Sequence, residues 1–334
     1  IEFELRKINS IFTHIEKFDF GNRQNLNKFT EPFKKEDLKP SYYMRRIKNL
    51  LASANIQTNP AVWLLTNAIF PWDFFHGYRL KKYKAQIAKI LPIWLERFYE
   101  LEALSSLANF AWLNENYIFP QLLEKEQSNQ FEFIQVGHPL LDVNKKVNND
   151  FGMVNNDVII ITGSNMAGKS TFLRTLGVNL CLAYAGSPVD AQVFRTKMFR
   201  LFTCIRVSDS VTDGLSYFYA EVKRLKALID ELQIQDDKPL FFLVDEIFRG
   251  TNNKERLLGS RAYIKALTGN NGLGFISTHD LELVKLADEI DQIKNYHFRD
   301  EVIDDKMIFN YKIQEGPCPT TNALKIMKIE GLPV

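Results

Sequence analysis

The stretch that decides the fold is VIIITGSNMAGKSTFLRTLG, residues 158–177. It opens with a run of β-branched residues, passes through a loop bracketed by Gly163 and Gly168, and ends in a helical pattern. Glycines let a loop turn tightly and point its backbone N–H groups at phosphate oxygens, and the start of a helix adds partial positive charge. The stretch therefore predicts a phosphate-binding loop between a buried strand and a helix.

The loop fits the nucleotide-binding pattern G-x-x-x-x-G-K-[ST] at every required position. We expect Lys169 to reach the β- and γ-phosphates of ATP, Ser170 to ligate Mg²⁺, and Thr171 to add a hydroxyl contact. Val147 and Asn149, upstream of the loop, are two further candidate nucleotide-binding residues. The candidate contacts within the loop are Gly163, Ser164, Asn165, Met166, Ala167, Gly168, Lys169, Ser170 and Thr171.

A candidate carboxylate centre follows in LFFLVDE, residues 240–246, where an apolar run ends in Asp245 and Glu246. A phosphate loop alone hydrolyses nothing, because metal and attacking water need a carboxylate centre. Asp245 is expected to coordinate Mg²⁺, and Glu246 to act as general base or to position the water. Taken alone, an Asp-Glu pair is more often a solvated strand end. After a phosphate loop and a buried strand, the catalytic interpretation is favoured.

Three further residues are candidates for the same site. His279 follows the apolar run GLGFIS, at the end of a strand where doubly wound sheets keep their ligands, so we expect it to contact the γ-phosphate or the water. With Lys169 and Glu246 it completes the predicted catalytic set. His138, in GHPL, either shapes the nucleotide pocket or caps a turn. Ser216 either caps the helix that follows it or contacts a γ-phosphate held by a second subunit.

The texture of the sequence along the whole chain predicts two domains, residues 1–130 and 131–334. The first is mainly helical, contains all four tryptophans, and has helix boundaries at Asn59-Pro60 and Phe70-Pro71. Its clearest amphipathic helix is expected at 91–113, with Pro92 in the first turn. The second domain alternates apolar runs with helical segments, which predicts an α/β fold with a mostly parallel sheet flanked by helices. The expected strands are 158–162, 240–245 and 274–277, and the expected helices are 169–184, 218–233, 253–268 and 281–287.

Composition narrows the function classes. A formal net charge of +2 over 334 residues gives no global nucleic-acid signature, so any basic surface must be local. The three cysteines show no metal spacing and indicate thiols in a reducing, cytoplasmic setting. No apolar run is long enough to cross a bilayer, so we expect no membrane segment within this chain. Since the chain opens on Ile1 and not on Met, we expect a piece of a longer protein.

Together these motifs resemble the ATPase domain of the MutS family of DNA mismatch-repair proteins. TGSNMAGKST resembles the family's TGPNMGGKST, GLSYFYAEV resembles G-x-S-x-F-x-x-E, VDEIFRGTNN resembles DE-x-x-RGT, and STHD carries the family's T-H. The tail, residues 309–333, resembles the closing segment that packs against a partner subunit. One departure is Phe248, which stands where the family usually has Gly, close to the expected dimer seam.

The resemblance implies a P-loop ATPase of the ABC/MutS type, preceded by a helical core and lever domain. It implies a Mg²⁺-dependent ATPase that binds ATP and DNA and works as an ATP-gated dimeric clamp. Each ATP would be held between Lys169 of one chain and Ser216 of the other, in a homodimer formed through the ATPase domain. The mismatch-reading domain has no counterpart here, since Phe29-Thr30-Glu31 fits its Phe-x-Glu letters but lies in a helical region.

Two groups of basic residues in the first domain could contact DNA phosphates, although such groups usually mean a solvated helix face. The family's helical arms clasp double-stranded DNA, which favours the DNA interpretation. Two alternatives stay open: a transporter-type nucleotide-binding domain, which would normally show an LSGGQ-type signature, and a scaffold that binds ATP only to dimerise. The basic residues are Lys34, Lys35, Lys39, Arg45, Arg46 and Lys48 in one group, and Arg79, Lys81, Lys82, Lys84 and Lys89 in the other.

Overall fold

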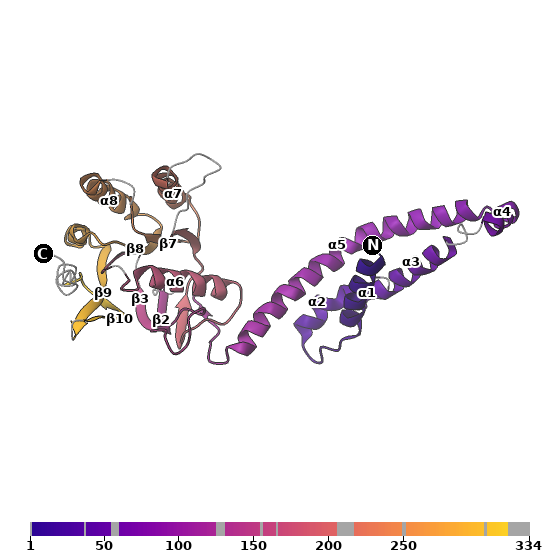
Figure 1. Cartoon of the computed structure of the whole chain (residues 1–334), viewed down its shortest axis with the longest axis horizontal. Helices are drawn as coiled ribbons and strands as arrows, with labels where there is room; N and C mark the ends of the chain where they lie inside the picture. The colour runs from indigo at the N-terminus through magenta and orange to yellow at the C-terminus, as the bar shows by residue number, and fades with distance from the viewer. Residues whose placement is uncertain are drawn as a thin grey trace. The chain divides into compact units, whose positions relative to one another are not determined.

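A computed structural model describes residues 2–36, 38–54, 60–124, 131–153, 156–164, 166–205, 217–248, 252–303 and 306–319. The chain divides into two compact units, residues 1–109 and 110–334 (Figure 1). The predicted boundary near residue 130 thus lies inside the second unit. Among the described helices, none combines the length and the apolar character needed to cross a membrane.

The secondary structure described in the first unit consists of helices, which surround an aromatic core. Phe12 packs against Phe33 and Trp94, with ring centroids 5.5 and 5.8 Å apart, and the indole nitrogen of Trp94 donates to the Leu38 carbonyl at 3.0 Å. Burying aromatic rings is the largest stabilising contribution available to such a small unit. Its helices are α1 (Glu2–Lys17), α2 (Gln24–Lys34), α3 (Pro40–Ala54), α4 (Pro60–Ile69) and most of α5 (Trp72–Leu113).

The prediction that a helix begins near Pro92 is wrong, because the helix begins twenty residues earlier, at Trp72. Pro92 lies midway along α5, which runs for 42 residues. A proline inside a helix removes a backbone hydrogen bond and costs about 3 kcal/mol. Here the apolar face continues across it, since Ile87 and Ile90 before Pro92 and Trp94 after it pack into the same core. This shared burial keeps the helix continuous through Pro92, where the sequence predicted a helix start.

The second unit confirms the mixed α/β prediction. Its six-stranded sheet has the order β10-β9-β4-β8-β7-β6, in which β10 alone is antiparallel to its neighbour. Hydrogen-bonded neighbours place the ends of β4, β8 and β7 side by side. The strands are β4 (Val158–Thr162), β6 (Arg200–Cys204), β7 (Leu240–Asp245), β8 (Gly272–Ser277), β9 (Ile293–Ile303) and β10 (Lys306–Glu315).

Both faces of this sheet are buried, which explains the uninterrupted apolar run of β4. Ile159 and Ile161 face one core, with α6 (Lys169–Tyr184), while Val158 and Ile160 face the other. Successive side chains of a strand point to opposite faces, so a strand covered on both sides has no polar positions. The second core is completed by α7 (Tyr217–Leu232), α8 (Asn253–Leu267) and the 3₁₀ helix η2 (Leu281–Asp288).

A second, four-stranded sheet packs on the α6 side, and the sequence analysis did not predict it. Its order is β1-β5-β2-β3, antiparallel except for the β1–β5 pair. Phe131 and Phe133 of β2 join the core around α6. The ring centroid of Phe131 lies 5.3 Å from that of Phe241, and the ring centroid of Phe133 lies 6.2 Å from that of Phe172. The strands are β1 (Gln121–Leu122), β2 (Phe131–Val136), β3 (Asn149–Met153) and β5 (Val193–Thr196).

The packing of β8 against β7 generates a stability prediction. A Cβ atom at Gly274 would lie 2.2 Å from the Phe242 carbonyl oxygen, so Gly274→Ala forces two paired strands apart. We expect a loss of about 1–3 kcal/mol, typical of overpacked cores, visible as a lower melting temperature by differential scanning calorimetry. The control is Gly152→Ala in β3, where nothing lies within 4 Å of an added Cβ. Equal melting temperatures for the two variants would contradict this packing.

Candidate functional site

The loop between β4 and α6 has a backbone that glycine alone suits at two points. Gly163 has φ +143°, and a Cβ there would lie 2.6 Å from the Phe298 carbonyl oxygen. Gly168 has φ +109° and precedes α6 directly; a Cβ there would lie 3.2 Å from the ring of Tyr311. Positive φ and close backbone approach both favour glycine. The two glycines therefore fix the loop tightly between β4 and the neighbouring strands β9 and β10.

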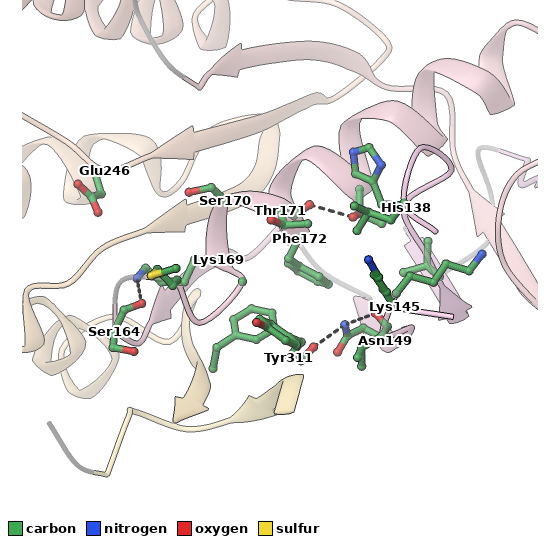
Figure 2. A pocket seen from close by; sticks show the side chains of 18 residues that line it. His138, Lys145, Asn149, Ser164, Lys169, Ser170, Thr171, Phe172, Glu246 and Tyr311 are labelled. Carbon is green, nitrogen blue, oxygen red and sulfur yellow. Dashed lines mark hydrogen bonds between the residues drawn. The ribbon is translucent and has the colours of Figure 1, made fainter. Parts of the chain in front are cut away.

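Lys169 lies at the centre of this loop. Its side chain is buried, and its ammonium donates to the Gly163 carbonyl oxygen at 2.6 Å. It also donates to the Ser164 carbonyl oxygen at 2.8 Å (Figure 2). A buried ammonium is costly unless its donors are satisfied, so the loop carbonyls hold this charge in place. The arrangement gives the loop a fixed positive charge, which suits an anionic ligand.

Asp245 joins three elements at one point. Its Oδ1 atom accepts a hydrogen bond from the Ser170 hydroxyl of α6 at 2.9 Å and from the Ser277 hydroxyl of β8 at 2.5 Å. The carboxyl group is buried at the end of β7. Ser170 and Asp245 are 75 residues apart, and the sequence analysis assigned both to one metal ion. Ser277 was missed, although it stands opposite Asp245 in the parallel register of β7 and β8.

Glu246 and His279 lie together beyond the same strand ends. Glu246 adopts φ +59°, and its backbone N–H donates to the Ser277 carbonyl at 3.0 Å. Its Oε1 atom is 3.5 Å from the Nδ1 atom of His279, at the outer limit of a hydrogen bond. The Glu246 side chain is mostly buried and that of His279 is half exposed. The two groups would have to approach to about 2.6–3.2 Å before a proton could pass directly between them.

Lys169, Ser170 and Glu246 line a cavity of about 490 Å³, a size that suits a nucleotide. Gly163, Ala167, Asp245 and His279 are not among its lining residues. Of the predicted site residues, the cavity is lined by His138, Val147, Asn149, Ser164, Met166, Gly168, Lys169, Ser170, Thr171 and Glu246. It is also lined by residues that the sequence analysis did not single out: Val136, Leu141, Lys145, Lys146, Phe172, Thr175, Phe298 and Tyr311.

Several predicted residues lie outside the described part of the chain. They are Asn165 of the loop, Ser216 before α7, the Arg249-Gly250-Thr251 segment and the tail from residue 320 onward. The roles proposed for them therefore stay predictions.

Comparison with known proteins assigns the family. The family model described as MutS domain V matches residues 159–334, more than half of the chain. The chain belongs to the MutS family. Curated relatives named DNA mismatch repair protein MutS include those of Lactobacillus johnsonii, 29% identical over 75% of this chain, and Clostridium tetani, 32% identical over 70%. These matches cover 30% and 27% of those proteins, so the chain spans less than a third of their length.

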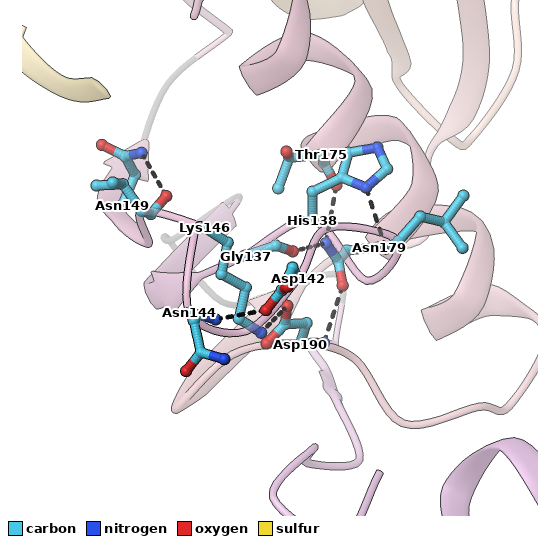
Figure 3. A network of polar contacts seen from close by, with 11 residues as sticks. Gly137, His138, Asp142, Asn144, Lys146, Asn149, Thr175, Asn179 and Asp190 are labelled. Carbon is cyan, nitrogen blue, oxygen red and sulfur yellow. Dashed lines mark hydrogen bonds and ion pairs between the residues drawn. The ribbon is translucent and has the colours of Figure 1, made fainter. Parts of the chain in front are cut away.

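A buried polar network supports the wall of the cavity in this MutS chain (Figure 3). Asn179 of α6 donates to the carbonyls of Gly137 at 2.9 Å and Thr175 at 2.8 Å, and accepts from the Asp190 N–H at 3.0 Å. Asp190 in turn forms a buried ion pair with Lys146 at 2.6 Å. The network ties the segment that carries His138 and Val147 to α6, because it bonds residues on both sides of that segment.

The sequence left open whether His138 lies at a pocket or caps a turn, and in the structure it takes part in both a cavity wall and a turn. It lines the cavity, and its Nδ1 atom accepts from the Leu140 N–H at 3.2 Å across a turn. Burial, reinforced by the Arg174 charge and opposed by Asp190, lowers the pKa of His138. An accepting Nδ1 and a lowered pKa both favour the neutral ring, so an uncharged imidazole stands at the cavity wall.

Asn149 lines the cavity, and its side-chain amide bonds to the backbone of β10. Its Nδ2 atom donates to the Tyr311 carbonyl at 3.0 Å, and its Oδ1 atom accepts from the Ile313 N–H at 2.8 Å. The pairing of β10 shifts register here, between Phe309 and Ile313, and Tyr311 has φ +52°. The Asn149 amide therefore supplies hydrogen bonds that the irregular strand needs, and it places Tyr311 beside the loop.

Phe248, the departure from the family's glycine, is partly buried between two helices. It has φ +56°, a conformation in which a bulky residue is uncommon. Its ring centroid lies 6.4 Å from that of Phe218 in α7 and 6.1 Å from that of Tyr263 in α8. The contacts stabilise a strained backbone just after the carboxylate pair. Its expected place at a dimer seam stays a prediction.

The Asn149 contacts generate a prediction. Asn149→Ala leaves the Tyr311 carbonyl and the Ile313 N–H without these partners, which should cost about 1–3 kcal/mol of unfolding free energy. We expect lower stability in chemical denaturation, together with weaker binding of any ligand that touches Tyr311. The matched control is Asn310→Ala, since the exposed Asn310 side chain only accepts a local hydrogen bond from Lys312. If both variants were as stable as wild type, the assigned role of Asn149 would be wrong.

Proposed function

We propose that this chain is a Mg²⁺-dependent ATPase engine of the MutS type, acting as half of an ATP-gated DNA clamp. The observation that carries the proposal is the hydrogen bond of 2.9 Å between Ser170 and Asp245. It brings the hydroxyl that follows the loop lysine and the acidic end of β7 to one place. Lys169 and Glu246 line the cavity beside it.

The residues present fit a magnesium ion. Mg²⁺ prefers oxygen ligands, keeps several waters, and usually takes one or two protein ligands together with substrate phosphates. The Ser170 hydroxyl and the Asp245 carboxylate are ligands of this kind, and Ser277 keeps the carboxylate oriented through its 2.5 Å hydrogen bond. When bound, the ion would neutralise charge on the β- and γ-phosphates.

The remaining residues of the site divide the work of hydrolysis. Lys169 would turn from the loop carbonyls to the phosphates, and the loop N–H groups would hold the phosphate oxygens. Glu246 would accept a proton from the attacking water or orient that water. His279, 3.5 Å from Glu246, would fix the direction of the carboxylate and sense the γ-phosphate. At the other end, His138, Val147 and Tyr311 would offer uncharged surface to the nucleoside.

The proposed homodimer completes this site. By resemblance, Ser216 of one chain would contact the γ-phosphate bound to Lys169 of its partner. In the described residues α7 begins at Tyr217, and the N–H groups at the start of a helix favour an anionic ligand. Closure of two such half-sites on ATP would join the subunits, and hydrolysis would release them.

DNA binding and mismatch repair, or a related processing of DNA structures, are proposed from the family and from local charge. The relatives are named as DNA mismatch repair proteins, and the basic residues of the first unit offer contacts to phosphates without reading sequence. A cytoplasmic location fits this role, as the three cysteines, all in described residues, form no disulfide. A transporter-type ATPase is not better supported, because the matching family model is that of MutS.

The base assignment yields a direct prediction. Glu246→Gln keeps the size of the side chain and removes the proton acceptor, so turnover should fall by about a hundredfold or more while ATP binding persists. Steady-state phosphate release and analytical ultracentrifugation with ATP measure the two effects, and the variant should accumulate as an ATP-bound dimer. Glu282→Gln is the control, since Glu282 pairs with Lys285 on the surface. Undiminished turnover in Glu246→Gln would refute the assignment.

DNA binding is tested separately by fluorescence anisotropy with homoduplex, mismatched and four-way-junction DNA. We expect binding that changes with ATP and weakens as salt rises, because phosphate contacts release counterions. Replacement of Lys81 and Lys82 by Gln should weaken binding to all three DNAs alike, since phosphate contacts read no sequence. Turnover without any DNA binding at low salt would leave the ATPase proposal standing and contradict the clamp.

A further inference from the structure

Figure 1 shows α4 next to the start of α5, and both of these helical segments carry exposed apolar side chains. We call Leu64, Leu65, Ile69, Phe74 and Tyr78 the apolar tip. Ile69 is 86% exposed, Phe74 82%, and the other three 64–66%. The described core of this unit is built from other residues, namely those around Phe12 and Trp94. Large exposed apolar side chains gathered on two consecutive helices are typical of an interaction site.

The tip has a defined shape. The indole nitrogen of Trp63 in α4 donates to the Asp73 carboxylate in α5 at 2.7 Å, and the Asp73 N–H donates to the Asn67 side chain at 3.1 Å. The rings of Phe70 and Phe75 lie 5.5 Å apart across the Pro71 turn. These contacts fix α4 against the first turn of α5. The exposed apolar side chains are therefore carried by an ordered pair of helices.

The stretch of sequence that contains the tip is strongly basic. Residues 40–95 contain eight Lys or Arg and a single acid, Asp73, which gives +7 against a net charge of +2 for the entire chain. Asp73 is already bonded to Trp63. Two of the arginines make cation–π contacts with aromatic rings. The guanidinium carbon of Arg79 lies 5.5 Å from the ring centroid of Phe75, and that of Arg46 lies 4.3 Å from the ring centroid of Tyr42. The eight basic residues are Arg45, Arg46, Lys48, Arg79, Lys81, Lys82, Lys84 and Lys89.

We propose that the apolar tip inserts into the headgroup region of an anionic lipid bilayer, with the basic residues of α3 and α5 on the lipid phosphates. Apolar side chains gain by entering the acyl boundary, and Lys or Arg near an anionic surface adds attraction. Trp63 and Tyr78 are of the types that concentrate at membrane interfaces. The ten residues of α4 span about 15 Å, half of the roughly 30 Å hydrocarbon core, so the tip lies in the surface and does not cross it.

Other partners satisfy only half of these features. DNA phosphates, which the same basic residues are proposed to contact above, would leave Ile69 and Phe74 in water, so DNA alone does not account for the apolar side chains. A second copy of the tip would cover the apolar side chains, but it would bring two strongly basic regions together. An anionic bilayer meets both requirements at once, which is why the proposal commits to it.

Vesicle flotation of the purified chain tests the proposal, with phosphatidylcholine vesicles that contain or lack phosphatidylglycerol. We expect flotation with the anionic vesicles, weakened by salt. The double variant Ile69→Glu/Phe74→Glu should bind at least about tenfold more weakly, because it places charge in the acyl boundary. Leu104→Glu, at another exposed site of α5, is the matched control and should float like wild type.

Three results would overturn the proposal. They are no flotation with anionic vesicles, flotation that the double variant leaves unchanged, and a lipid-free dimer that the double variant dissociates in ultracentrifugation. The last result would assign the tip to a second copy. ATP turnover of the double variant is measured on the same samples. It should match wild type, so a failure here is distinguishable from a failure of the ATPase proposal.

Discussion

The site depends on one interaction, the acceptance by Asp245 of hydroxyl hydrogen bonds from Ser170 and Ser277. It joins the first turn of α6, the end of β7 and the end of β8, three elements that are far apart in the chain. A buried carboxylate is costly unless it is bonded, so the two hydroxyls stabilise the charge that a metal ion would later share. Because β8 lies between β4 and β7, Ser277 also fixes the distance between the loop and the acidic strand.

A second constraint comes from the side of the cavity built by β3, β9 and β10. Phe298 and Tyr311 press against Gly163 and Gly168, so the loop has no room for side chains at those positions. Asn149 holds Tyr311 by bonding to an irregular part of β10. The loop is therefore fixed by residues more than a hundred positions away, and its shape does not follow from its own sequence alone.

This explains which features the sequence could predict. The bounds of β4, β7 and α6 were predicted as the structure has them, because a fully buried strand and the helix after a glycine turn are local patterns. The pairing of Ser170 with Asp245 followed from motif chemistry. The four-stranded sheet was missed since its strands are short and β2 carries a bulge with Gln135 at φ +53°. The course of α5 through Pro92 was also missed, because it depends on burial in a distant core.

The measurement that tests the account most directly is isothermal titration calorimetry of the chain with ATP, with and without Mg²⁺. The account predicts one tight site per chain that needs Mg²⁺, that weakens strongly in Asp245→Asn, and that is lost in Lys169→Ala. These effects follow because the first variant removes a metal ligand and the second removes the buried charge of the loop. Binding that is indifferent to Mg²⁺ and to both substitutions would place the nucleotide elsewhere and would contradict the site described above.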